Sequence, residues 1–252
     1  MGKKKKKTGK AAPAAVKAAP DCKKYIGLCL IPLTFFAVEC FGWVFLRGGT
    51  GTKWPLVFGL LWAVMLSAVV LGIPAKAGRI VFGVVYGLST IYAVVETGYY
   101  ILFKEMMWLS DFRYASEGSD YFSVLLSYPV HWWLGILALI GLGAATVWLF
   151  PKGKYNWKQT VAAVVLFALA GNCAYRLPYD QFAQDKDVKY ARSDYGRMQS
   201  LEAAYENLFN THRLYQICGL YQTLWKDVYA HNIYPLTPAY TQAHEAGRQE
   251  ID

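Results

Sequence analysis

Five long apolar segments with almost no charged residues dominate the sequence, and they restrict what the chain can fold into. They cover residues 25–46, 55–73, 79–103, 131–150 and 158–177. Each is close to the ~20 residues that an α-helix needs to cross the hydrocarbon core of a bilayer. Inside a bilayer, backbone N–H and C=O groups find no water, so a helix must satisfy them internally. We therefore predict an all-α polytopic membrane protein with about five transmembrane helices, forming a bundle over residues 25–177.

Charged residues are few overall, and the basic ones are concentrated at the N-terminus. Only 17% of the 252 residues are charged, whereas soluble domains carry about a quarter. Nine of the 26 Lys and Arg lie in the first 24 residues, in a segment also rich in Ala and Pro. We predict that residues 1–24 are a disordered polybasic cytoplasmic tail that contacts anionic phospholipid. Nucleic acid is not an expected partner, because no nucleic-acid-binding fold accompanies the basic run.

The basic residues between the spans predict the orientation of the chain. They gather in the turn Lys76–Arg79 and the loop 152–158, whereas the other loops carry few. Cytoplasmic loops are enriched in Lys and Arg, so we predict a multi-pass protein of the cell membrane with its N-terminus cytoplasmic. Five spans then leave the C-terminus extracellular. The outer loop 104–130 is either a structured loop or a pair of interfacial segments lying along the outer leaflet.

The tail, residues 178–252, has the pattern of an extracellular helical linker. Amphipathic periodicity predicts one helix over residues 200–210, with Ser200 as its N-cap, and a second over residues 213–231. Prolines at positions 235 and 238 end regular structure. Two amphipathic helices bury little by themselves. We expect them to need a partner: the membrane surface, the outer mouth of the bundle, or a domain outside this chain.

Polar residues inside the spans are the candidate functional residues, because burying an ionisable group in a bilayer is costly. Glu39 lies in the first span, Glu96 in the third, and Asn172 and Arg176 in the fifth, all toward the predicted outer side. One interpretation is a polar cluster that holds a lipid headgroup. The other is that the acids pair with Arg176, or are protonated, and fasten the bundle together.

Familiar catalytic and metal-binding motifs are not found in the sequence. It contains no HExxH, no GxSxG and no P-loop, and its five cysteines form no CxxC. The four histidines have no metal-ligand spacing. We therefore assign no catalytic, cofactor-binding or metal-ligating residue in this chain.

The segment AYENLFNTHRLYQICGLYQTLWKDVY, residues 204–229, contains a GLY-x-x-x-x-[KR]-D pattern. This tail, together with the segments at 31–43 and 99–112, resembles the N-terminal membrane and linker region of lipoteichoic acid synthase-like proteins. These are phosphoglycerol transferases of the sulfatase superfamily in Gram-positive bacteria, and the resemblance covers about residues 25–252. The pattern falls on Gly219, Leu220, Tyr221, Lys226 and Asp227.

The resemblance implies a membrane-anchoring and positioning module for a transferase that acts on lipid headgroups at the outer leaflet, in cell wall biogenesis. That family's chemistry takes place in an extracellular sulfatase-fold domain with a divalent metal, manganese or magnesium, and a threonine nucleophile. A strand such as NVIVIxxES opens that domain, and none occurs before Asp252. The resemblance therefore implies a catalytic domain in cis or in trans, and no cofactor in this chain. Two alternatives stay open: the same module of a phosphoethanolamine transferase, or a stand-alone, non-catalytic membrane scaffold that binds a partner enzyme.

Overall fold

The computed structural model describes residues 22–46, 53–108, 127–151, 156–182 and 211–230, together with Val124 and Tyr205. Residues 1–21 of the predicted N-terminal tail, most of loop 104–130 and most of the predicted helix 200–210 lie outside the described residues. Residues 22–24, which were predicted to belong to the disordered tail, are instead helical. Six helices are described, and no strand occurs in these ranges. They are α1 (Cys22–Leu46), α2 (Trp54–Leu71), α3 (Ala75–Phe103), α5 (Val130–Trp148), α6 (Trp157–Phe182) and α9 (Thr211–Val228).

Five of these helices are long and apolar enough to cross a membrane, which confirms the predicted class of fold. The spans run over Tyr25–Leu46, Trp54–Leu71, Ala75–Phe103, Val130–Trp148 and Trp157–Pro178. Their ends agree with the predicted segments to within four residues. The largest difference is at α3, which begins directly after Pro74. A proline has a fixed φ and no N–H to donate, so it is tolerated where a helix starts.

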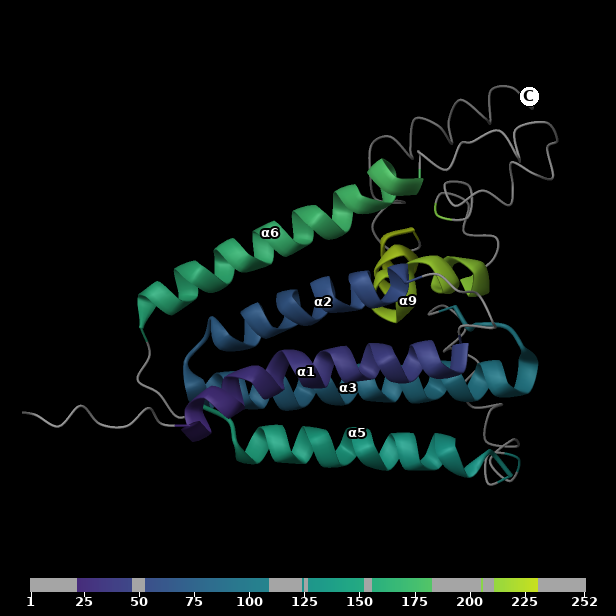
Figure 1. The fold of residues 1–252 in the computed structure, drawn as a ribbon, viewed down its shortest axis with the longest axis horizontal. Helices are drawn as coiled ribbons and strands as arrows, with labels where there is room; N and C mark the ends of the chain where they lie inside the picture. The colour runs from purple at the N-terminus through teal and green to yellow at the C-terminus, as the bar shows by residue number, and fades with distance from the viewer. Residues whose placement is uncertain are drawn as a thin grey trace, which may run out of the picture.

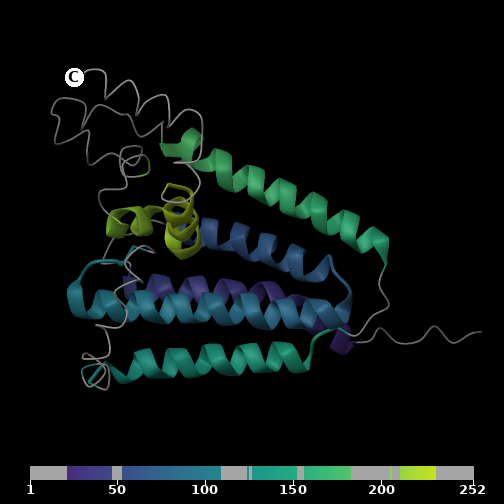
Figure 2. The same cartoon turned by 180° about the vertical axis from the view of Figure 1, so that it is seen from behind.

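The helices lie side by side, with α1 and α3 in the middle of the bundle (Figure 1, Figure 2). Helix α1 contacts α2, α3 and α5, whereas α6 packs on α2 at one edge. The buried face of α1 carries apolar side chains with no exposed surface, such as Ile31, Phe35 and Val38. The buried hydrophobic residues of α6 include three small ones along one stripe, namely Ala163, Ala170 and Ala174. Small residues let two membrane helices approach closely.

Helix α9 is not a further span but packs at one end of the bundle, against α1 and α2 (Figure 1). We call this the α9 end; α1 ends there at Leu46 and α2 begins there at Trp54. Three α9 side chains, Tyr215, Leu220 and Tyr221, belong to the same hydrophobic core as α1 and α3. The partner of this amphipathic helix is therefore the mouth of the bundle, one of the three partners that the sequence left open.

The predicted second tail helix is present, but it is broken at Gly219. This residue has φ 81° and ψ −179°, which is not a helical conformation. The two halves of α9 consequently run in different directions (Figure 1). Helical periodicity predicts a continuous helix here, and the break creates a new helix N-terminus inside the protein.

Candidate functional site at the α9 end of the bundle

Glu39, seven residues before the end of α1 at Leu46, binds the broken region of α9. Its carboxyl group accepts hydrogen bonds from the backbone N–H of Leu220, at 2.7 Å, and of Tyr221, at 3.2 Å. The first N–H groups of a helix have no acceptor within the helix, so the Glu39 carboxyl group satisfies two donors that the helix itself cannot. Glu39 is fully buried. It therefore caps the second half of α9 from within a membrane span.

Two glycines make this contact possible. The φ and ψ of Gly219 lie in a region that is essentially restricted to glycine, and a Cβ at this position would overlap Glu39 Oε1. In α2, a Cβ at Gly59 would overlap the Cγ of Glu39. The backbones of α2 and α9 thus approach Glu39 from two sides, at distances that only glycine permits.

Side-chain hydrogen bonds connect the second half of α9 to three spans. The Tyr221 hydroxyl donates to the carbonyl of Phe35 in α1, at 3.1 Å. The indole N–H of Trp62 in α2 donates to Gln222 Oε1, at 2.7 Å. Gln222 Nε2 in turn donates to the carbonyl of Ala174 in α6, at 3.5 Å. These bonds hold the tail helix in one position relative to the bundle.

Tyr205 extends this set of contacts further along the tail. Its hydroxyl accepts a hydrogen bond from Gln222 Nε2, at 3.2 Å. The ammonium group of Lys226 lies 3.9 Å from the centre of the Tyr205 ring, within the distance at which a cation is attracted to an aromatic face. Tyr205 is itself buried, so a second part of the tail is packed at the α9 end.

These contacts involve the residues of the GLY-x-x-x-x-[KR]-D pattern. Gly219 provides the break, Leu220 and Tyr221 bind Glu39, and Lys226 contacts Tyr205. Asp227 is buried as well. The residues of the pattern therefore dock the tail on the membrane bundle.

The first half of α9 is fastened to the end of α1. His212 Nε2 lies 3.0 Å from the carbonyl oxygen of Leu46, and its ring packs on Tyr100. In the same half of α9, Cys218 is fully buried in a cluster with Phe58 and Leu214. Burial holds the pKa of the Cys218 thiol well above its usual value, although the charge of Lys226 acts in the opposite direction. This thiol is consequently a packing group and not a reactive one.

Glu96 likewise accepts a hydrogen bond from a backbone N–H, near the end of α3. The backbone N–H of Met107 donates a hydrogen bond to Glu96 Oε2, at 3.2 Å. Between them, Lys104 ends α3 in the left-handed conformation, so that the chain turns back. Glu96 therefore holds the segment that follows α3 against the bundle.

The structure separates the four candidate residues into two groups. Glu39 and Glu96 are both fully buried, whereas Asn172 and Arg176 are exposed on α6. Sequence reasoning missed Gly59 and Trp62, for which no local signal exists. It also missed the break at Gly219, although an isolated glycine in a helical pattern is a recognised warning.

No protein-family model, curated protein or solved structure was found to match this chain. The fold and the site by themselves define a helical membrane protein whose tail helix is docked into one end of its transmembrane bundle. The docking of α9 and the residues that make it are therefore the features that bear on function.

Proposed function

We propose that this chain is the membrane-anchoring and positioning module of a lipoteichoic acid synthase-like transferase that acts on lipid headgroups at the outer leaflet. The docking of α9 through Glu39 is the observation that carries this proposal. A flexible tail after the last span would leave whatever follows it free to move. A tail helix held by three spans sets the height and the direction of the chain that follows.

The strength of the docking supports a positioning role. A hydrogen bond contributes a net of about 0.5–1.5 kcal/mol, and Glu39 makes two with the α9 backbone. Burial of a large apolar side chain contributes a further ~1.5–3 kcal/mol, and Leu214, Ile217 and Leu220 are fully buried. The sum of several such terms favours a docked helix over a transient contact.

Positioning is what a transferase of lipid headgroups requires of its membrane part. The reacting groups lie in a narrow layer at the membrane surface, and holding reactants in the right geometry is a large part of catalysis. In this proposal the α9 end faces the outer leaflet, consistent with basic Lys76, Arg79 and Lys158 at the opposite end of the bundle. A sulfatase-fold catalytic domain, in cis or in trans, supplies the chemistry and its manganese or magnesium ion.

Within this function, Glu39 fastens the module and does not hold a headgroup. Both of its oxygens accept hydrogen bonds from the α9 backbone, and its side chain has no exposed surface. Asn172 and Arg176, exposed on α6, do not share this environment. The geometry thus favours the fastening interpretation of the buried acid over direct contact with lipid.

The proposal is tested by deleting the coding region of this chain in the cells that produce it. We expect loss of glycerophosphate polymer from the envelope, measured by immunoblot. The full chain should restore it, the exposed-site control Lys53→Gln should restore it equally, and a chain ending at Phe182 should not. Loss of phosphoethanolamine from lipids, seen by mass spectrometry, would instead establish the phosphoethanolamine alternative. Unchanged amounts of both products would leave the scaffold alternative and overturn the proposal.

A further inference from the structure

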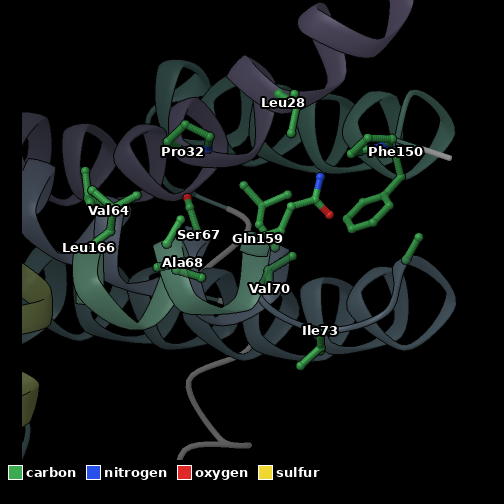
Figure 3. A pocket seen from close by; sticks show the side chains of 15 residues that line it. Leu28, Pro32, Val64, Ser67, Ala68, Val70, Ile73, Phe150, Gln159 and Leu166 are labelled. Atoms are coloured by element: carbon green, nitrogen blue, oxygen red, sulfur yellow. The ribbon is translucent and has the colours of Figure 1, made fainter. Parts of the chain in front are cut away.

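A cavity of about 450 Å³ lies between α1, α2 and α6. It is at the end of the bundle opposite to α9, where α2 ends at Leu71 and α6 begins at Trp157. Its lining is almost entirely apolar (Figure 3). The walls include Leu28 and Pro32 of α1, Val64 and Ala68 of α2, and Leu166 of α6.

The shape of this groove follows from the residues that surround it. Helix α6 packs on α2 through small side chains, and Ala162 and Ala163 contribute only methyl groups to the wall. The Thr160 hydroxyl donates to the carbonyl of Gly72 at 2.7 Å and holds the start of α6 against the end of α2. Pro32 of α1 has no N–H to donate, which favours a locally less regular wall. The result is a preformed groove between transmembrane helices.

Two polar side chains line the groove: Ser67 in its floor, whose hydroxyl donates to the carbonyl of Ala63, and Gln159 at one end. The carboxamide of Gln159, in the first turn of α6, points into it (Figure 3). Lys158 directly precedes this residue, and Lys76 directly follows the lining residue Ala75; both lysines are exposed. Within the described ranges, Asp and Glu occur only in the parts of the chain toward the α9 end. The groove therefore has an apolar interior and a positively charged rim.

Among possible occupants, the apolar interior and the positively charged rim favour an anionic lipid over a protein segment. From Gln159 to Leu166 the groove follows seven residues of α6, about 10 Å along the helix. It thus extends from the charged rim toward the middle of the membrane, in the direction of an acyl chain.

We propose that this groove binds one acyl chain of an anionic glycerophospholipid. The phosphate-bearing headgroup lies between Lys76 and Lys158, the ester region faces Gln159, and the chain contacts Ala68 and Leu166. This site is separate from the docking of α9 and lies in the other leaflet. It gives the module an attachment to anionic lipid that depends on folded structure and not only on the lysines of the N-terminal tail.

The test uses the purified full chain in nanodiscs and a phosphatidylglycerol probe with a photoreactive diazirine in the middle of one acyl chain. Crosslinks are mapped by peptide mass spectrometry to the segment Val64–Ala68, which forms the floor of the groove and includes the buried Ser67. Ala162→Phe fills the groove. Loss of about two buried methylene groups weakens binding about tenfold, so we expect crosslinking to this segment to fall by about that factor.

The matched control is Val165→Phe, on an exposed position of α6 that does not line the groove; it should leave the crosslinks unchanged. If Ala162→Phe does not fold, as judged by size-exclusion chromatography, Ala162→Leu and competition on the unchanged chain replace it. Excess unlabelled phosphatidylglycerol should then suppress the crosslinks, and free glycerol phosphate should not. Crosslinking that persists when the groove is filled or the competitor is in excess would overturn the proposal.

The headgroup is tested with a second probe that carries the same diazirine on phosphatidylcholine. We expect several-fold more crosslinking from phosphatidylglycerol, because lysines near a membrane surface attract anionic headgroups. The double variant Lys76→Gln, Lys158→Gln should lose this preference, and Lys53→Gln, at the α9 end, should keep it. Equal crosslinking by the two lipids in the unchanged chain would overturn the assignment of an anionic headgroup. None of these measurements depends on transferase activity, so their outcome is independent of the proposed function.

Discussion

Replacement of Glu39 should release α9 from the bundle. In Glu39→Ala, the N–H groups of Leu220 and Tyr221 lose their acceptor inside the protein. A buried donor without an acceptor costs about 1–3 kcal/mol, so the two together cost about 2–6 kcal/mol. Glu39→Gln keeps one carbonyl oxygen but turns an amide donor toward the other N–H, so we expect about half of that loss.

Cys218 is a native reporter of this change. It is fully buried next to Leu214 while α9 is docked, so a water-soluble maleimide reaches it only when α9 leaves the bundle. With the other four cysteines replaced by alanine, its labelling rate follows the undocked population. Because 1.4 kcal/mol corresponds to a factor of ten, Glu39→Ala should raise the rate at least about 30-fold and Glu39→Gln at least about fivefold.

The matched control is Glu105→Ala, which removes an exposed acid close to the end of α3 and should leave the labelling rate unchanged. Circular dichroism should show that the helices of each variant remain folded. An unchanged rate at Cys218 in a folded Glu39→Ala variant would refute the reasoning, because it would mean that the two hydrogen bonds do not hold α9 in place.

Three further predictions concern the same end of the bundle. Gly219→Ala should lower the free energy of docking of α9 by about 1–3 kcal/mol, measured by the same maleimide assay. The control Gly83→Ala, in open space on α3, should not lower it. In a Glu39→Ala background the effect of Gly219→Ala should be smaller, because the overlap with the carboxyl group is gone. In the complete enzyme that the proposed function implies, Glu96→Gln should impair activity more than expression, compared by polymer immunoblot and protein level, because the Glu96 carboxyl group holds the segment after α3. Normal values of both would mean that this contact is not needed for function. In the unchanged chain, burial raises the pKa of Cys218 and so favours the neutral thiol. Alkylation of Cys218 should therefore stay slow as the pH rises through the ordinary thiol range near about 8.5. An alkylation rate that rises with pH like that of a free cysteine would contradict the burial.

Much of the fold could be predicted from local patterns. The length of each apolar run determines that it spans, because only a helix of that length satisfies its own backbone across the hydrocarbon. The amphipathic pattern of residues 213–231 likewise predicts a helix that needs a partner. Neither pattern depends on distant residues, and this is why the described helices match them closely.

The candidate site was predictable only in part. An acid within a span is costly, so the importance of Glu39 and Glu96 follows from their positions alone. The inclusion of Asn172 and Arg176 rested on their depth along the fifth span. Depth does not determine which face of a helix points inward, and α6 turns both residues outward. The rotation of a helix is decided by what packs against it, here the small residues that face α2.

The sequence by itself determined that the chain has five apolar spans, an acid inside the first of them and an amphipathic helix in its tail. Only the tertiary structure decided that this acid and this helix meet. Glu39 binds backbone N–H groups that lie 181 and 182 residues further along the chain. Backbone donors are common to every residue except proline, so they leave no trace in the residue types. Their availability depends on the break at Gly219, and that break is stable because the carboxyl group of Glu39 is there to accept the N–H groups it exposes.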